Sequence, residues 1–215
     1  AMQPTLDTDT SQIRAELQAA IEACNQQVLG NPGAVKFAFI AFLAGGHLLI
    51  EDLPGLGKTT LARTLAKVLG LSFKRVQFTT DLLPSDIIGV SIFNPEKRSF
   101  EFHRGAVFTA ILLADEINRA PPRTQSALLE AMAEHQVSVD GDTFTLPEPF
   151  FVIATQNPTD LAGTFPLPDS QLDRFTLRIS MGYVSAEQER ALLKNSARID
   201  SNAAASCFSA ERLLE

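Results

Sequence analysis

The feature that most constrains the fold is a glycine-bearing stretch, residues 51–60, that joins a short apolar run to a segment with helical spacing. The run before it, residues 47–50, has the length and composition of a buried parallel strand. After it, Leu61, Leu65 and Val68 recur at the spacing of one helix face among good helix formers. A strand, a tight turn and a helix in this order predict a loop whose backbone N–H groups and helix dipole bind phosphate.

The end of this stretch, Gly57-Lys58-Thr59, carries its chemistry. A lysine at this position reaches the β- and γ-phosphates of a nucleotide, and the threonine hydroxyl is a ligand of Mg²⁺. The general pattern, G-x-x-x-x-G-K-[ST], starts with glycine, whereas this chain has Asp52 there. An ordinary strand–turn–helix with a capping threonine is the alternative interpretation. We expect the nucleotide contacts to come from Asp52, Pro54, Gly55, Leu56, Gly57, Lys58, Thr59 and Thr60.

Two carboxylates follow a second apolar run, residues 111–114. In an open parallel sheet, ligands bind at the carboxyl ends of the strands, so both acids should point toward the phosphate site. We expect Asp115 to hold Mg²⁺ through water and Glu116 to polarise an attacking water molecule. A third apolar run, residues 150–155, is followed by Gln156 and Asn157. An amide there, which we expect to be that of Asn157, is placed to orient that water or, alternatively, to form a turn.

The alternation of apolar strands with helices predicts an α/β fold with a doubly wound, five-stranded parallel sheet. Residues 90–102 and 137–145 each alternate about a turn and predict two inserted β-hairpins. We also expect a helix-period segment from Gly105. Ahead of the sheet, one helix should begin at Thr10 or Ser11.

A second helix should begin at Pro32 and place Phe37, Phe39 and Phe42 in the core. The link before it, Val28, Leu29 and Gly30, lies where a nucleotide base could rest, although a plain helix connection is nearly as good an interpretation.

Three parts are expected along the chain. Residues 1–9 should be disordered, with Ala1 and Met2 as a cloning remnant, and residues 10–183 should form the α/β core. Residues 184–215 should begin a helical lid, because about thirty residues are too few to bury a core alone.

Composition narrows the classes of partner. The net charge of −7 disfavours nucleic acid as the main partner, since phosphate backbones bind basic surfaces. The two cysteines, Cys24 and Cys207, are far apart and fit small buried side chains in a reducing compartment. No apolar run approaches the ~20 residues that span a bilayer. We therefore expect a cytoplasmic protein without direct membrane insertion.

The combination of motifs resembles the MoxR family of AAA+ ATPases, in the clade with a hairpin inserted in helix 2. The resemblance covers roughly residues 10–195. It is carried by residues 51–59, 81–86, 113–122, 154–158 and 165–175.

This resemblance implies a hexameric ring with ATP between neighbouring subunits. Lys58, Thr59 and Thr60 would be the Walker A contacts and Asp115 and Glu116 the Walker B pair. Asn157 would be sensor 1. Arg174 would be an arginine finger that reaches the next subunit's γ-phosphate, although an arginine at a strand entrance is also a common surface ion-pair partner.

The function that the resemblance implies is hydrolysis of ATP to ADP and phosphate by a chaperone-like remodelling factor, with a von Willebrand A domain protein as partner. One alternative is a nucleotide-gated assembly module with negligible turnover. Another is a motor subunit, either of a chelatase-like complex or of a nucleic-acid translocase.

Overall fold

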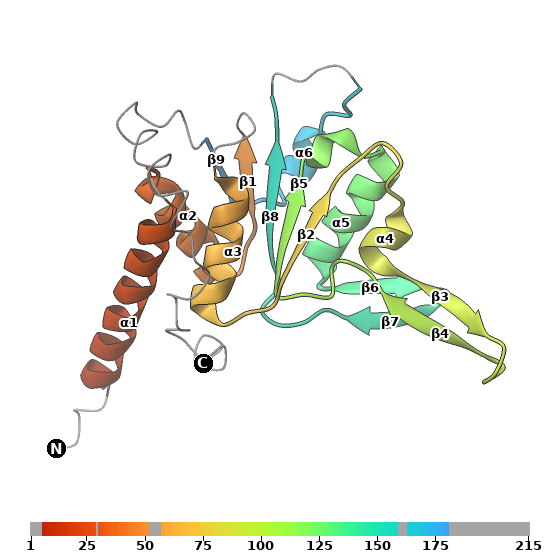
Figure 1. Ribbon diagram of the computed structural model, residues 1–215, viewed down its shortest axis with the longest axis horizontal. Coiled ribbons are helices and arrows are strands. Elements are labelled where there is room, and N and C mark those ends of the chain that lie inside the picture. Colours follow the sequence, from red (N-terminus) through yellow and green to blue (C-terminus); the bar gives the residue numbers. More distant parts are fainter. Residues whose placement is uncertain (1–5, 29, 52–56, 159–162, 181–215) are drawn as a thin grey trace, which may run out of the picture.

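The computed structural model describes residues 6–28, 30–51, 57–158 and 163–180 (Figure 1). Its centre is a parallel sheet of five strands, in the order β2-β5-β8-β1-β9, which confirms the predicted doubly wound sheet. Short apolar runs form these strands, and all five point their carboxyl ends to the same edge. The strands are β1 (Leu48–Glu51), β2 (Phe73–Gln77), β5 (Ile111–Asp115), β8 (Phe151–Gln156) and β9 (Leu177–Ile179).

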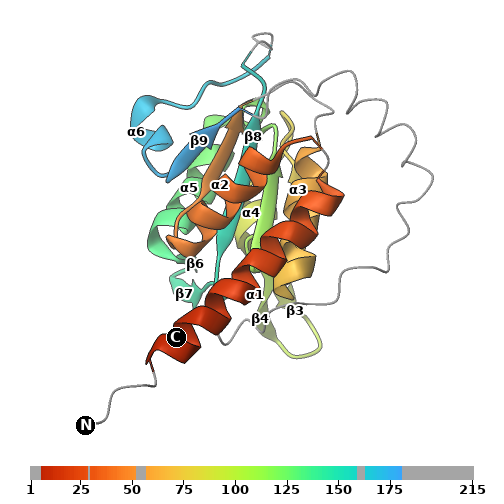
Figure 2. The same ribbon diagram turned by 90° about the vertical axis from the view of Figure 1, so that its left-hand side faces the viewer.

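Helices cover both faces of the sheet (Figures 1 and 2). On one face lie α1 (Leu6–Gln27), α2 (Pro32–Leu43) and α3 (Lys58–Leu69). On the other lie α4 (Pro84–Ile88) and α5 (Pro122–Glu134). Two short helical turns, η1 (Ile117–Arg119) and α6 (Asp169–Leu172), complete the described helices.

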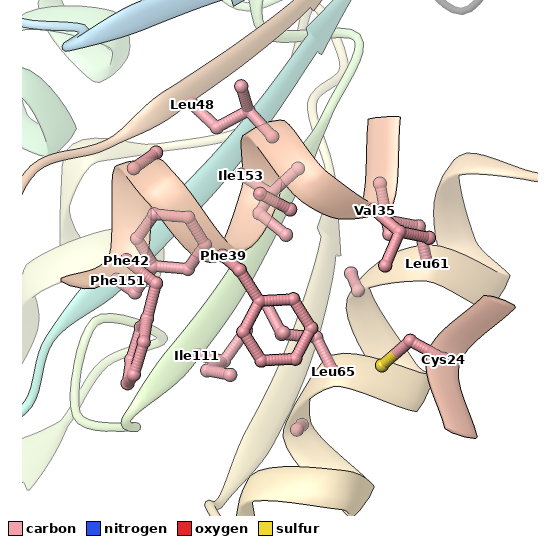
Figure 3. Close-up of a cluster of buried hydrophobic side chains, with 14 of the residues drawn as sticks. Cys24, Val35, Phe39, Phe42, Leu48, Leu61, Leu65, Ile111, Phe151 and Ile153 are labelled. Carbon is pink, nitrogen blue, oxygen red and sulfur yellow. The ribbon is translucent and has the colours of Figure 1, made fainter. Parts of the chain in front are cut away.

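The alternation of strand side chains divides the core in two. Leu48 and Ile50 pack under α2 and α3, whereas Leu49 between them faces the α5 side. Figure 3 shows the first cluster, in which Phe39 and Cys24 lie with sheet residues under the helices. Cys24 is fully buried and behaves as a small apolar side chain, as predicted.

Two expectations about the first helices are wrong. Helix α1 begins at Leu6, ahead of the predicted cap at Thr10 or Ser11, because residues 6–9 contain no helix breaker. Residues 6–9, expected to be disordered, are therefore helical. Phe39 and Phe42 are buried, but Phe37 is 43% exposed, because residues two apart on a helix point to nearly opposite sides.

Both predicted hairpins are present: β3 (Gly89–Asn94) with β4 (Ser99–Arg104), and β6 (Gln136–Val139) with β7 (Asp142–Thr145). They lie near one another below α4 and α5 in Figure 1. Phe102 and Phe144 join them through stacked rings whose centroids are 3.8 Å apart.

The helix expected from Gly105 does not form. The backbone of Ala106 and Val107 instead donates hydrogen bonds to Asp86 and Ile87 at the end of α4, both at 3.0 Å. Gly105 approaches this segment so closely that a Cβ atom would lie 2.4 Å from the Ile87 oxygen. Tertiary contact with α4 therefore overrides the helical spacing.

No helix among the described residues is both long and apolar enough to cross a membrane.

Candidate functional site

A cavity of about 380 Å³ lies at the carboxyl edge of the sheet, against the first turn of α3. The strands β2, β5 and β8 end at this cavity, as the rule for open parallel sheets predicts. Its lining brings together most of the predicted catalytic and metal-binding residues. The described residues that line it are Gly57, Lys58, Thr59, Thr60, Arg75, Gln77, Asp115, Glu116, Thr155, Gln156 and Asn157.

The glycine before α3 has a conformation that other residues rarely adopt. Gly57 has φ 84°, in the left-handed region, and its carbonyl accepts the Leu61 N–H at 2.9 Å to start the helix. The first N–H groups of α3 therefore open onto the cavity beside Lys58 and Thr59. The predicted contacts Asp52, Pro54, Gly55 and Leu56 lie outside the described residues.

Both oxygens of the Asp115 carboxylate are engaged. Oδ1 accepts a hydrogen bond from the Thr155 hydroxyl at 2.7 Å. Oδ2 accepts from Nη2 of Arg75 at 2.7 Å and from its Nε at 3.2 Å. The Asp115 side chain is 17% exposed, so this acid stands at the sheltered floor of the cavity.

Glu116 reaches the same cavity because the chain turns sharply after β5. Its φ of 56° is left-handed, a conformation that costs a non-glycine residue roughly 1–2 kcal/mol. The Glu116 N–H donates to the Thr155 hydroxyl at 2.9 Å, which holds the turn. Two neighbouring residues that a continued strand would send to opposite faces thus line one site.

The Glu116 carboxylate is also held on its side of the cavity. Oε2 accepts from the Gln77 amide at 2.8 Å and from Nη1 of Arg119 at 3.0 Å. The Arg119 side chain is 48% exposed. Asn157, the predicted sensor residue, lines the cavity at the end of β8, and its backbone oxygen accepts from the Asn118 amide at 3.4 Å.

Three residues of the site had not been singled out from the sequence. Thr155 is 1% exposed and its hydroxyl bridges the two acidic positions. Arg75 and Gln77 lie two apart on β2, which pairs with β5 in the register Gln77↔Asp115. The only sequence signal was polar residues at alternate positions of a strand, and it names no partner.

Arg174 does not line this cavity. Its Nη1 donates to the backbone oxygen of Leu129 at 2.6 Å, and it borders a separate surface hollow with Ser126 and Glu130. The predicted trans role requires a position away from the chain's own site, and this location meets that requirement without testing the role.

The expected base-binding link also stays a prediction. Val28 is 4% exposed and packs in the core, and Gly30 has φ 88°. Neither lines the cavity, and Leu29 lies outside the described residues.

The residues present fit a magnesium ion held with a nucleotide. Mg²⁺ takes oxygen ligands and is bound by one or two protein groups together with phosphates and water. Thr59 and Asp115 supply a hydroxyl and a carboxylate to one cavity. No cage of three or more His, Cys, Asp or Glu side chains occurs within the described part of the chain.

Comparison with known proteins agrees with this geometry. The sequence model of the ATPase family associated with various cellular activities (AAA) matches residues 47–177. The chain is 52% identical over 177 residues to the uncharacterized protein YeaC of Bacillus subtilis, covering 82% of this chain and 55% of YeaC. It is 46% identical over 177 residues to chaperone MoxR1 of Mycobacterium tuberculosis, covering 82% of this chain and 47% of MoxR1.

A solved structure of a candidate ATPase from Cytophaga hutchinsonii matches with a TM-score of 0.85 and 39% identity, over 98% of this chain and 66% of that one. The chain spans about half the length of the curated relatives that it matches. Since the family match covers the sheet and its cavity, the chain belongs to the MoxR family of AAA ATPases.

Proposed function

We propose that this chain binds ATP with Mg²⁺ in the cavity at the sheet edge and hydrolyses it to ADP and phosphate. The observation that carries the proposal is the convergence of Lys58 and Thr59, from the start of α3, with Asp115 and Glu116, from the end of β5, on one cavity. This is the set that phosphoryl transfer to water needs: a cation and backbone N–H groups for the phosphates, metal ligands, and a base that orients water.

Each residue has a distinct role in this mechanism. Lys58 and the N–H groups of α3 bind the β- and γ-phosphates, and Thr59 and Asp115 hold the metal. When bound, Mg²⁺ neutralises charge on those phosphates. Glu116 orients the attacking water and takes its proton, with the Asn157 amide on the other side of that water.

The site is completed by a neighbouring subunit in this proposal. Arg174 lies outside the chain's own cavity, so its guanidinium is available to a second copy in a hexameric ring. An arginine supplied in trans is worth ~10³–10⁵ in rate. A lone subunit should therefore turn over slowly even with every local residue in place.

The wider role proposed is that of a chaperone-like remodelling factor. Its support is the similarity to MoxR1, which is named a chaperone. A von Willebrand A domain protein as partner and a cytoplasmic location remain predictions of the same proposal. Because the chain spans only part of its relatives, these roles concern the whole protein.

A nucleotide-gated assembly module is the second candidate. The observation that favours it is that Gln77 and Arg119 both donate hydrogen bonds to the Glu116 carboxylate, so the proposed base is already occupied. In that case ATP would set the assembly state with negligible turnover.

Two substitutions separate these candidates. Lys58→Ala should abolish binding of a fluorescent ATP analogue, whereas Glu116→Gln should keep binding and lose phosphate release by at least about 100-fold. Glu134→Gln, which neutralises an exposed acid on α5, is the matched control. If the wild-type chain assembles with ATP but releases no phosphate at any protein concentration, the assembly module is the correct function.

A further inference from the structure

Arg75 enters the cavity without a role in the mechanism above. Nη2 and Nε of its guanidinium both donate to one carboxylate oxygen, Asp115 Oδ2, at 2.7 and 3.2 Å. Nη2 also donates to the Gln77 side-chain oxygen at 3.3 Å. The guanidinium is thus fixed on the acid that the proposed function assigns to the metal.

The sheet itself places Arg75 there. In the parallel pair of β2 and β5, Arg75 lies beside Leu113 and Gln77 beside Asp115, two steps along the same face. Lys74, on the opposite face, instead donates to the Gly105 oxygen at 3.2 Å. Backbone pairing therefore sends Arg75 toward α3 and the phosphate site.

A guanidinium and a divalent cation make conflicting demands on the same carboxylate. Asp115 Oδ1 is already taken by Thr155, and Oδ2 carries both bonds from Arg75. Coordination of Mg²⁺, directly or through water, would bring two positive charges beside a third in a sheltered site where Coulomb repulsion is poorly screened.

We propose that Arg75 and Mg²⁺ compete for Asp115, and that arrival of the metal moves the guanidinium off this acid toward the nucleotide phosphates. This proposal rests on the proposed function. It makes Arg75 a positioning residue that links metal loading to a movement of its own side chain. The positive charge of the guanidinium would then lie beside the phosphates instead of beside Asp115.

The exposure of the two partners permits such an exchange. The Arg75 side chain is 47% exposed, while Asp115 is 17% exposed, so the arginine can swing away while the acid stays in place. An ion pair with one partner in solvent is weak and easily broken. A planar guanidinium also suits bidentate contact with phosphate as well as with carboxylate.

The simpler alternative is that the Arg75–Asp115 ion pair is a permanent structural link between β2 and β5. Five residue pairs of backbone register already join these strands, from Phe73↔Ile111 to Gln77↔Asp115. One ion pair at the cavity end would add little stability to this backbone pairing. The alternative also predicts a different outcome, since removing a purely structural ion pair should not tighten metal binding.

The test measures affinity for a fluorescent ADP analogue across a Mg²⁺ titration that starts in EDTA. Arg75→Ala should lower the Mg²⁺ concentration for half-maximal effect by about twofold to fivefold, the scale of one lost ion pair. The same variant should weaken ADP binding at saturating Mg²⁺ by a similar factor, because only then does the wild-type guanidinium face the phosphates. Arg75→Lys should have a Mg²⁺ midpoint between those of the wild type and Arg75→Ala, since lysine keeps the positive charge but not the planar bidentate geometry of the guanidinium.

Arg14→Ala removes the same charge from the exposed surface of α1 and should change neither quantity. The proposal is overturned if Arg75→Ala leaves the Mg²⁺ midpoint unchanged or raises it. Arg75→Gln provides the same readout should the alanine variant fail to fold. If the wild-type chain binds no nucleotide, the proposed function fails and this proposal with it; if it binds and only the Arg75 comparison fails, the proposed function stands.

Discussion

Polar side chains gather at both ends of this sheet, and the two groups differ in kind. At the carboxyl end, Asp115 and Glu116 are ionisable, partly exposed and held by arginines, with a left-handed turn between them. At the opposite end, just ahead of β1, His47 is 4% exposed and joins the layers. Its Nε2 bonds to the Met132 oxygen at 3.3 Å, and its Nδ1 accepts the Val152 N–H at 3.1 Å.

The difference shows what each end contributes. Around His47 the hydrogen bonds are buried and neutral, so they serve the fold. Around Asp115 and Glu116 the bonds go to long, exposed side chains that can exchange partners, and the backbone carries a strained turn. We therefore expect changes at the carboxyl end to alter turnover and changes at the other end to alter stability.

The largest effect should come from Arg174, the arginine that we propose reaches a neighbouring subunit. Arg174→Ala should lower the turnover of the assembled protein by ~10³-fold or more, because the transition-state charge loses its partner. The free energy of unfolding in urea should fall by no more than about 1–3 kcal/mol, the scale of the lost hydrogen bond to the Leu129 oxygen. Mixing Arg174→Ala with Glu116→Gln subunits should restore part of the phosphate release, since each supplies what the other lacks. Absence of any recovery would remove the trans role from Arg174.

His47 gives the converse prediction. Burial, opposed by the bond to Met132 and aided by the nearby His135, lowers the pKa of His47 from 6.5 to about 4. The unfolded chain therefore binds the extra proton first, and folding stability falls as pH drops from 6.5 to 4. A shift of this size corresponds to about 3 kcal/mol.

Urea unfolding at a series of pH values measures this contribution. His47→Gln should cost about 1–3 kcal/mol at pH 7 and then lose less stability on acidification than the wild type. His103→Gln, at an exposed position on β4, should follow the wild-type curve. If stability depends on pH in the same way in the wild type and in His47→Gln, a group other than His47 causes that dependence.

Thr155 joins the two behaviours, and its replacement should alter both stability and turnover. Thr155→Val removes the hydroxyl that bonds Asp115 and the Glu116 N–H, and we expect a loss of about 1–3 kcal/mol in stability together with slower turnover. Thr143→Val, on the exposed hairpin strand β7, is the matched control. Wild-type turnover in Thr155→Val would show that the turn at Glu116 keeps its conformation without the Thr155 hydroxyl.

The residues whose place at the cavity could be predicted from sequence are those whose position depends on one rule. Asp115, Glu116 and Asn157 follow apolar strands, and parallel strands bring their carboxyl ends together wherever those strands fall in the order. Lys58 and Thr59 follow a local motif in the same way. The position of these side chains could thus be predicted before the shape of the cavity was known, while their roles stay predictions.

The residues missed or misjudged depend on partners far away in the chain. Arg75 and Thr155 matter because cross-strand pairing places them beside Asp115, about forty positions away in sequence. Gly105 is drawn out of a helical pattern by its contact with α4, and Phe37 is exposed because only one side of α2 meets the sheet. Periodicity in a single segment contains none of this information.

A crystal structure of the chain with a non-hydrolysable ATP analogue and Mg²⁺ tests the central claim most directly. The account predicts the terminal phosphate at Lys58 and the metal between Thr59 and Asp115, with the guanidinium of Arg75 no longer on that carboxylate. An analogue bound elsewhere, with Lys58 turned from the phosphates and Asp115 far from the metal, would contradict it.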